Sequence, residues 1–278
     1  MYWRKRGFLM YNNEYREDMY TDKQFNDVYQ IIRTNLTYGM INGDDKCTII
    51  LGGQPGAGKS TFYGMRDDLV DYIAINGDEY RRFHPNFSEI IRTDPEHYAE
   101  RTQSFSNQVV ETLIEDLGNQ GYNLVIEGTL RNPDVPIRTC QELERKGYKT
   151  DLVVVACDAE IAWKATLSRA EAQKESGQIV RLVPIDIYNK TVHLIPDNLE
   201  VIKNQKCFNS ITIINREGNI LFDNTMLRND PIETLKKELN IENWENKYHS
   251  FQQEFLRVKI DLLQTQYERN RDENHERS

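Results

Sequence analysis

The chain has 278 residues, 38% of them hydrophobic and 28% charged, and its 35 Lys and Arg against 44 Asp and Glu give a formal net charge of −9. This length and composition are enough to bury a core, which excludes disordered and collagen-like proteins, and the acidity argues against a general nucleic-acid or anionic-membrane binder. Without a run of roughly 20 apolar residues or a signal-peptide core, we expect a cytoplasmic protein that binds neither membranes nor nucleic acid.

Helix and strand patterns alternate along the chain. Thr21 and Gln24 have the spacing of a capping box, which predicts that a helix occupies about 21–39. Apolar runs predict strands over 47–53, 71–75, 123–127, 151–157 and 210–215, and the segments between them predict helices over about 94–118, 134–147, 159–176 and 184–204. Apolar strands separated by helices indicate an α/β fold with a mostly parallel central sheet and helices on both faces.

The last part of the chain has a different pattern. NREGNILFDN predicts a short hairpin around Glu217 and Gly218 after the last strand. Within 243–278, apolar residues recur with the heptad spacing of a helix, at Trp244, Tyr248, Phe251, Phe255, Val258 and Leu262. A helix that folds back on the body is favoured over an oligomerisation or partner helix. We expect one domain over 1–228 and a C-terminal helical extension over 229–278.

The segment at 53–61 has the pattern of a phosphate-binding loop. It matches G-x-x-x-x-G-K-[ST] and lies between a predicted strand and a predicted helix. Glycines let the backbone curl so that successive N–H groups point at phosphate oxygens, and a helix N-terminus adds partial positive charge. Lys59 is expected to reach the β and γ phosphates, and the Ser60 hydroxyl to bind Mg²⁺. The predicted nucleotide-binding residues are Gly53, Gln54, Pro55, Gly56, Ala57, Gly58, Lys59, Ser60 and Thr61.

Two acidic residues follow predicted strands at the carboxyl edge of the sheet, where ligands bind in open α/β folds. Asp78 follows the second strand and is expected to hold an acceptor hydroxyl, the alternative being a residue that only caps a helix. Glu127 ends the third strand, and Gly128 with two polar groups follows it. This arrangement suits binding of sugar hydroxyls or of Mg²⁺ through water, although a solvated strand end would look the same.

Two arginines flank a predicted hinge. Arg169 lies on the helix from 159, and Arg181 follows the break at Gly177, just before Pro184. Arginines in this arrangement can fold over a nucleotide and supply charge to the phosphoryl group in transit, as in small-molecule kinases with a lid. Without the other motifs, two unrelated surface arginines would explain them equally well.

The order and spacing of these motifs resemble the zeta toxin family, bacterial toxins of toxin–antitoxin pairs that phosphorylate UDP-N-acetylglucosamine. The resemblance covers about residues 21–224. It is carried by TDKQF, GGQPGAGKST, INGDEYRRFHPNF, SFSNQVVE, GYNLVIEGTLRNPDVP, an Arg on a helix, an Arg before a Pro, and INREGNILFDN. It implies a P-loop kinase-like three-layer fold, with ATP and Mg²⁺ as cofactors and UDP-N-acetylglucosamine as acceptor. The heptad helix lies outside the resemblance.

Carried over residue by residue, the resemblance implies roles for the candidate site residues. Lys59 is implied to be the P-loop lysine, and Asp78 is implied to be the base that accepts the proton of the sugar 3′-hydroxyl. The other two implied catalytic residues are Arg169 and Arg181, the lid arginines that bind ATP. The implied substrate-binding residues are Asp78, Asn107, Glu111, Glu127, Thr129 and Arg131, of which Asn107 and Glu111 lie four apart on one helix face. Leu130 stands where the family pattern has Gly, which implies a narrower or shifted acceptor wall.

The resemblance also implies a small helical antitoxin that binds at the N-terminal helix, about 21–39, and blocks the nucleotide site. Two other functions remain open at this stage. Another small-molecule or nucleic-acid-end kinase could share the core, although residues 89–120 hold 7 acidic and 2 basic residues, a poor surface for a polynucleotide. A nucleotide-binding regulatory protein would need only the loop, and not Asp78, Glu127, Arg169 and Arg181.

Overall fold

The computed structural model describes residues 18–224 and 229–276, with side chains of the last helix described at 241–262 and at 264. The described strands form one six-stranded sheet in the order β2-β3-β1-β4-β5-β6. Their bounds are β1 Cys47–Gly52, β2 Tyr72–Ile75, β3 Asn123–Glu127, β4 Lys149–Val155, β5 Ser210–Ile214 and β6 Ile220–Phe222. β1 and β5 are each parallel to β4, and β6 is antiparallel to β5. The predicted α/β fold with a mostly parallel sheet is confirmed.

The helices follow the predicted alternation with the strands. The α-helices are α1 Asp22–Thr37, α2 Lys59–Gly64, α3 Gly77–Tyr80, α4 Phe87–Thr93, α5 Tyr98–Arg101, α6 Gln103–Gln120, α7 Asp134–Glu144, α8 Ala159–Glu175, α9 Ile185–Gln205, α10 Pro231–Leu239 and α11 Ile241–Glu276, and the 3-10 turns are η2 Asp67–Leu69 and η3 Arg81–Phe83. None of the helices in the described ranges is long and apolar enough to cross a membrane.

The chain divides into two compact units. The first contains the described residues up to Asp44 together with Asp71–Leu124, and the second contains Asp45–Val70 and Val125–Ser278. The P-loop and the lid arginines therefore belong to the second unit, and Asp78 belongs to the first. The boundary predicted after residue 228 remains a prediction.

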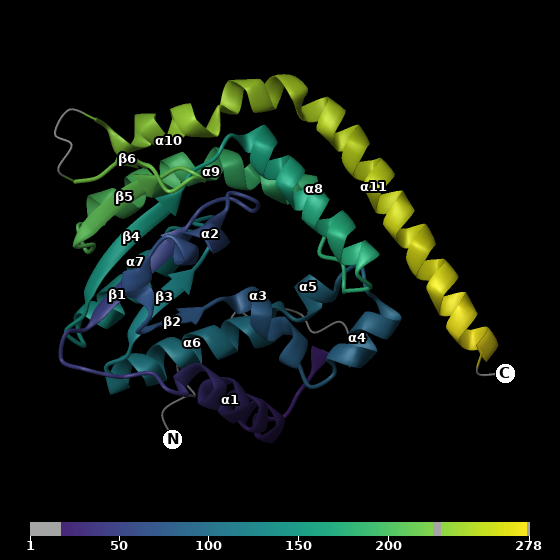
Figure 1. Cartoon of the computed structure of the whole chain (residues 1–278), viewed down its shortest axis with the longest axis horizontal. Helices are drawn as coiled ribbons and strands as arrows, with labels where there is room; N and C mark the ends of the chain where they lie inside the picture. The colour runs from purple at the N-terminus through teal and green to yellow at the C-terminus, as the bar shows by residue number, and fades with distance from the viewer. Residues whose placement is uncertain (1–17, 225–228, 277–278) are drawn as a thin grey trace. The chain divides into compact units, whose positions relative to one another are not determined.

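In the first unit, α1 lies against α6 (Figure 1). The predicted capping box is present, because Thr21 accepts from the backbone N–H of Gln24 and the Gln24 side chain accepts from that of Thr21. Asp116 of α6 accepts from the Tyr29 hydroxyl at 2.7 Å and from Arg33 Nε at 2.7 Å. These bonds and the buried side chains of α1 fix one face of this helix to α6.

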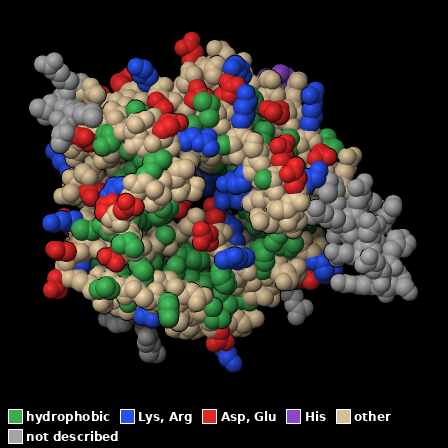
Figure 2. All heavy atoms as spheres, viewed as in Figure 1, with side chains coloured by type: hydrophobic (Ala, Val, Ile, Leu, Met, Phe, Trp, Pro, Cys, Tyr) green, Lys and Arg blue, Asp and Glu red, His purple; other side chains and the backbone are tan. Residues whose placement is uncertain are grey.

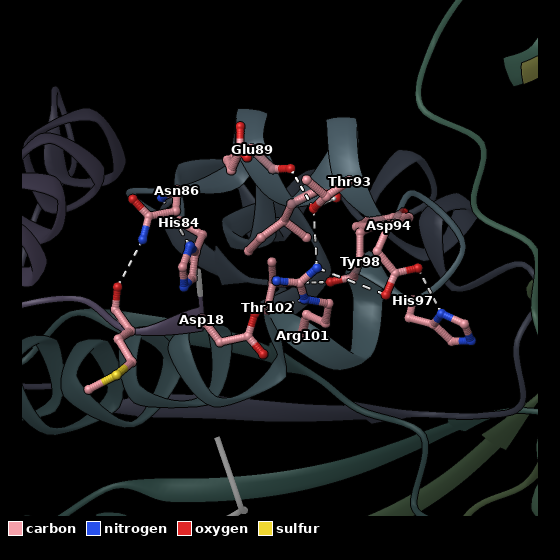
Figure 3. Close-up of polar contacts among 12 residues, drawn as sticks. Asp18, His84, Asn86, Glu89, Thr93, Asp94, His97, Tyr98, Arg101 and Thr102 are labelled. Atoms are coloured by element: carbon pink, nitrogen blue, oxygen red, sulfur yellow. Dashed lines mark hydrogen bonds and ion pairs between the residues drawn. The ribbon is translucent and has the colours of Figure 1, made fainter. Parts of the chain in front are cut away.

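The segment before α1 is tied to the α4–α5 region (Figure 3). Arg101 Nε donates to Asp18 Oδ1 at 2.8 Å, and the two side chains are only 5% and 12% exposed. Asp94 lies 3.9 Å from Arg101 Nη1 on another side of the guanidinium. Asn86 Nδ2 donates to the carbonyl oxygen of Met19 at 2.9 Å. The start of α1 is therefore held at two points in the same unit.

The helix predicted over 94–118 is wrong in its bounds. In its place, α4 ends at Thr93, α5 is a single turn, and α6 runs from Gln103 to Gln120. Asp94 leaves the helical conformation with φ −151° and ψ 66°, and Thr102 has φ −95° and ψ 1°. Since Asp94 precedes Pro95, the helical region of its backbone is disfavoured, and the chain turns there. Gly121 ends α6 in the left-handed conformation, with φ 83°.

In the second unit, β1, β4, β5 and β6 form a core with α9 and α10. This core contains Ile50, Leu152, Val154, Ile195, Leu199, Ile202, Ile211, Ile213, Phe222, Leu235 and Leu239, among others. β4 lies two residues earlier than predicted, because Asp158 caps α8 through the backbone N–H groups of Glu160 and Ile161. The carboxyl ends of β1, β4 and β5 therefore lie side by side at one edge, where the P-loop begins.

The helix that carries the predicted heptad pattern folds back on the second unit, which confirms the favoured prediction. α11 runs beside α8 (Figure 1), and Trp244, Phe251 and Leu262 are buried. Trp163 of α8 lies 6.1 Å from Trp244 and 6.0 Å from Phe255, measured between ring centroids. Two ion pairs also link α8 to α11. Lys247 Nζ lies 2.7 Å from Glu160 Oε2, and Lys174 Nζ lies 2.6 Å from Asp261 Oδ2.

The ion pairs at Glu160 make the stability of the α8–α11 contact depend on pH. Hydrogen bonds from Lys164 and Lys247 lower the pKa of Glu160 from 4.5 to about 2. A depressed carboxyl pKa adds stability above the unfolded value, and this stability is lost as the pH falls from about 4.5 towards 2. Glu160→Gln should therefore cost about 1 kcal/mol of unfolding free energy at pH 6, and less at pH 3. Urea unfolding at both pH values measures this.

Glu175→Gln is the matched control, because it removes an exposed carboxylate from the same helix. A Glu160→Gln penalty that stays constant from pH 6 to pH 3 would contradict the assigned role of these ion pairs.

Candidate active site

The P-loop has a backbone that only glycine tolerates at three positions. Gly53, Gly56 and Gly58 have φ of 144°, 77° and 99°. A Cβ at Gly53 would lie 2.4 Å from the carbonyl oxygen of Val155, and one at Gly56 would lie 2.0 Å from that of Ala162. The loop therefore rests directly on the backbone of β4 and of α8, which leaves no room for side chains there.

Side chains of the loop hold it in this curled form. Lys59 Nζ donates to the carbonyl oxygens of Gly53 at 2.9 Å and of Gln54 at 3.2 Å. The Gln54 side chain is buried, and its Nε2 donates to the carbonyl oxygen of Cys157 at 2.5 Å. The Thr61 hydroxyl donates to the carbonyl oxygen of Gly58 at 2.5 Å. The ammonium group of Lys59 is therefore folded over the loop, where a phosphate-binding lysine is needed.

Glu127 lies at the carboxyl end of β3 and is linked to the helix that follows the P-loop. The hydroxyl of Tyr63 on α2 donates to Glu127 Oε1 at 3.0 Å. The backbone N–H of Gly128 donates to the carbonyl oxygen of Leu51 in β1 at 2.9 Å. Arg131 Nε donates to the Thr129 hydroxyl at 3.2 Å. Tyr63 was missed by the sequence analysis, because nothing in its local pattern indicates a partner 64 residues away.

Leu130, which stands where the family pattern has Gly, is buried in the core of the second unit. Its φ of 54° is left-handed, which agrees with a position where the family pattern has glycine. The side chain is 4% exposed and packs in the core with Ile50 and Leu152, and Asn198 Nδ2 donates to its carbonyl oxygen at 2.8 Å. A Cβ at Gly52 would lie 2.3 Å from Leu130 Cδ1, so the absence of a side chain at Gly52 makes room for the leucine. The leucine side chain is therefore accommodated in the core, and the narrower or shifted acceptor wall implied by the resemblance remains a prediction.

The two predicted lid arginines stand on either side of the predicted break. Arg169 lies on the exposed side of α8, which ends at Glu175, and Gly177 has φ 69°. The backbone N–H of Arg181 donates to Gln173 Oε1 at 2.9 Å. Gln173 therefore connects the last turns of α8 to the loop that carries Arg181.

Asp78 in the first unit is not the cap of a helix. Asn76 caps α3, since its Oδ1 accepts from the backbone N–H of Asp78 at 3.1 Å, so the capping alternative for Asp78 is wrong. Asp78 Oδ1 instead accepts from Arg81 Nε at 3.1 Å, and the Asp78 side chain is 35% exposed. Its carboxylate is therefore accessible while one of its oxygens is held by an arginine.

Arg81 connects Asp78 to another predicted site residue. Its side chain is 10% exposed and donates to the carbonyl oxygen of Ala99 and to Gln103 Oε1, the latter at 2.7 Å. Gln103 Nε2 in turn donates to Asn107 Oδ1 at 2.5 Å. Arg81 and Gln103, which the sequence analysis did not single out, thus bring Asp78 and Asn107 into one hydrogen-bonded chain. Glu111 lies one turn further along α6, and like Asn107 it is exposed.

The described residues bring no three or more His, Cys, Asp or Glu side chains together as a metal site. On the face of the molecule shown in Figure 2, Lys and Arg side chains are interspersed with Asp and Glu. The net charge is therefore not concentrated in a single acidic surface on that face.

Comparison with known proteins identifies the family of the chain. Residues 38–226 match the family model described as Zeta toxin. The chain is 34% identical over 225 residues to Toxin zeta of Streptococcus pyogenes, covering 80% of this chain and 78% of that one. It is 32% identical over 207 residues to Toxin PezT of Streptococcus pneumoniae serotype 4, covering 73% of this chain and 82% of that one.

A solved structure agrees with this assignment. It comes from work on the PezAT chromosomal toxin–antitoxin system of Streptococcus pneumoniae, with a TM-score of 0.73, 29% sequence identity, and coverage of 80% of this chain and 89% of that one. The chain belongs to the zeta toxin family, and its class is accordingly that of the toxin kinases.

Proposed function

We propose that the protein is a toxin kinase that transfers the γ-phosphoryl group of ATP to the 3′-hydroxyl of the amino sugar in UDP-N-acetylglucosamine. This activity would disturb peptidoglycan synthesis in the cytoplasm of a bacterium. The observation that carries the proposal is the P-loop, in which Lys59 is folded over a backbone that only glycines permit, in a chain of the zeta toxin family.

The residues of the P-loop are suited to bind a nucleoside triphosphate with Mg²⁺. Glycines at 53, 56 and 58 keep the loop free of side chains that would fill a phosphate cradle. Lys59 would bind the β and γ phosphates, and the Ser60 hydroxyl would hold the metal ion. Bound Mg²⁺ supplies charge neutralisation at the phosphate oxygens. The remaining chemistry falls to side chains of this chain.

Catalysis in the proposed reaction is mainly electrostatic. Charge in a phosphoryl-transfer transition state spreads over the transferred group, so cationic groups around it lower the barrier most. Lys59, Arg169 and Arg181 supply this charge. Asp78 accepts the proton of the sugar hydroxyl, and Arg81 holds the Asp78 carboxylate in position through its 3.1 Å bond.

Acceptor recognition is assigned to five polar side chains. Glu127 and Thr129 bind the amino sugar, with Arg131 beside Thr129. Asn107 and Glu111 contribute exposed polar groups from one face of α6. The hydrogen bond from the Tyr63 hydroxyl keeps the Glu127 carboxylate oriented for hydroxyl binding.

An antitoxin partner is proposed at α1. One relative in the comparison is Toxin PezT, and one similar solved structure comes from work on the PezAT toxin–antitoxin system. α1 buries Phe25, Tyr29 and Ile32 in its own unit, while Ile31 is 56% exposed and Tyr38, just after the helix, is 88% exposed. The same helix can therefore pack on α6 and still offer apolar side chains to a small helical antitoxin that blocks the nucleotide site.

The test is incubation of the protein with ATP, Mg²⁺ and UDP-N-acetylglucosamine, followed by mass spectrometry of the sugar nucleotide. We expect a product heavier by one phosphate, and none without Mg²⁺. Phosphorylation of other sugar nucleotides or of nucleic-acid ends in place of this acceptor would show that the acceptor assignment is wrong. ATP binding without any phosphorylated product would favour a regulatory nucleotide-binding protein.

A further inference from the structure

The turn between β5 and β6 brings an arginine to the P-loop. Asn215 Oδ1 accepts from the backbone N–H groups of Glu217 at 3.1 Å and of Asn219 at 2.8 Å, which closes the turn around Arg216. The Thr61 hydroxyl lies 3.3 Å from the carbonyl oxygen of Arg216. A turn 155 residues further along the chain thereby lies against the start of α2.

The side chain of Arg216 extends along the loop itself. A Cβ built at Gly58 would lie 2.9 Å from Arg216 Cγ and 3.6 Å from Arg216 Nε. The stem of Arg216 therefore lies over Gly58, and the side chain as a whole is half-buried. The Arg216 guanidinium also lies close enough to the Cys157 thiol to lower its pKa, against the larger rise that burial causes.

The strand order places Arg216 on one particular side of the P-loop. The loop follows β1, with β3 on one side of β1 and β4, then β5, on the other. Glu127, proposed to bind the acceptor sugar, ends β3, and Arg216 follows β5. The γ-phosphate must face the acceptor, so the nucleoside end of the nucleotide extends towards β4 and β5. Arg216 therefore lies on the nucleoside side.

The charges around Arg216 favour a base over another phosphate as its ligand. Burial raises the pKa of Glu238 on α10, and the charges of Glu217, the next residue after Arg216, and of Asp158, the next residue after Cys157, raise it further. These carboxylates disfavour an anionic phosphate. Both oxygens of Asp158 already accept hydrogen bonds from α8 and from Asn240, so Glu217 and Glu238 are the groups assigned to accept from an amino group. A planar guanidinium stacks well on the face of a base.

We propose that Arg216 forms the base subsite of the nucleotide, stacking on an amino-bearing purine whose amino group faces the carboxylates of Glu217 and Glu238. This subsite rests on the proposed function, because it requires a nucleotide in the P-loop. Arg216 would determine nucleotide affinity and base preference without touching the transferred phosphoryl group.

The experiment compares two probes, MgATP and magnesium tripolyphosphate, which has the phosphates but no base. Dissociation constants are measured by calorimetry for the unchanged chain and for Arg216→Ala. We expect Arg216→Ala to raise the dissociation constant of ATP about tenfold, as expected for the loss of a desolvated stacking contact. The dissociation constant of tripolyphosphate should change by no more than about twofold. Arg216→Lys keeps the charge without the planar group, so it should weaken ATP similarly. The Arg216→Lys variant therefore tests the proposal even if Arg216→Ala does not fold.

Arg145→Ala is the matched control, since Arg145 is an exposed arginine at the end of α7 in the same unit. Equal losses for ATP and tripolyphosphate would overturn the base subsite and indicate a phosphate contact. Undiminished ATP binding in both Arg216 variants would also overturn it. If the unchanged chain binds neither probe, the proposed function itself fails, and the subsite with it.

Discussion

Asp78→Asn should reduce the rate of phosphoryl transfer by about 10²- to 10⁴-fold while leaving ATP affinity nearly unchanged. Asparagine keeps a carbonyl oxygen that can accept from Arg81 Nε, so the chain from Asp78 through Arg81 to Gln103 is preserved. What is lost is the carboxylate that would accept the hydroxyl proton. Steady-state rates with UDP-N-acetylglucosamine and calorimetric titration with ATP separate the two effects.

Glu79→Gln is the control for Asp78→Asn, because it neutralises the neighbouring exposed carboxylate on the same short helix. An equal loss of rate in Glu79→Gln would point to a general charge effect on α3. In bacteria, expression of the unchanged chain should arrest growth, and Asp78→Asn should relieve the arrest. Equal toxicity of this variant would indicate a cause other than phosphoryl transfer.

Lys59→Met should weaken ATP binding and reduce turnover even more strongly. The methionine side chain is of similar length but cannot neutralise phosphate oxygens or donate to the carbonyl groups of Gly53 and Gln54. A charged hydrogen bond is worth about 1.5–3 kcal/mol, so ATP affinity should fall about 10- to 150-fold, and turnover by more. Calorimetry with MgATP and the mass-spectrometric assay measure the two quantities.

Lys190→Met is the matched control, since Lys190 is exposed on α9 in the same unit. It should retain wild-type ATP affinity and turnover. A Lys59→Met variant that binds ATP normally would contradict the assignment of the nucleotide to this loop.

Local patterns in the sequence predicted the elements whose causes are local. Each parallel strand of the second unit is a short apolar run, and the capping box at Thr21 and the glycines of the P-loop act within a few residues. The P-loop could therefore be located from its spacing alone. The break between α5 and α6 could not, because Arg101 and Thr102 at the break are held by groups from other elements, Asp18 and Arg81 among them.

The partners of the candidate site residues come from distant parts of the chain. Asp78 could be singled out from its position after a strand, but its bond to Arg81 depends on the acceptors that Ala99 and Gln103 offer to the same guanidinium. The contact of Arg216 with Gly58 depends on the order of β1, β4 and β5 in the sheet. Such contacts follow from tertiary packing, and no local spacing indicates them.

The attachment of α8 to α11 bears on how the two lid arginines would work. α8 is fixed near both of its ends, by the aromatic contacts of Trp163 and by the ion pair of Lys174 with Asp261. Arg169 lies between these points, whereas Arg181 lies beyond Gly177. In the proposed reaction, the fold thus holds the charge of Arg169 in place before the nucleotide binds. The free-energy cost of rearrangement in each turnover then comes mainly from the loop that carries Arg181.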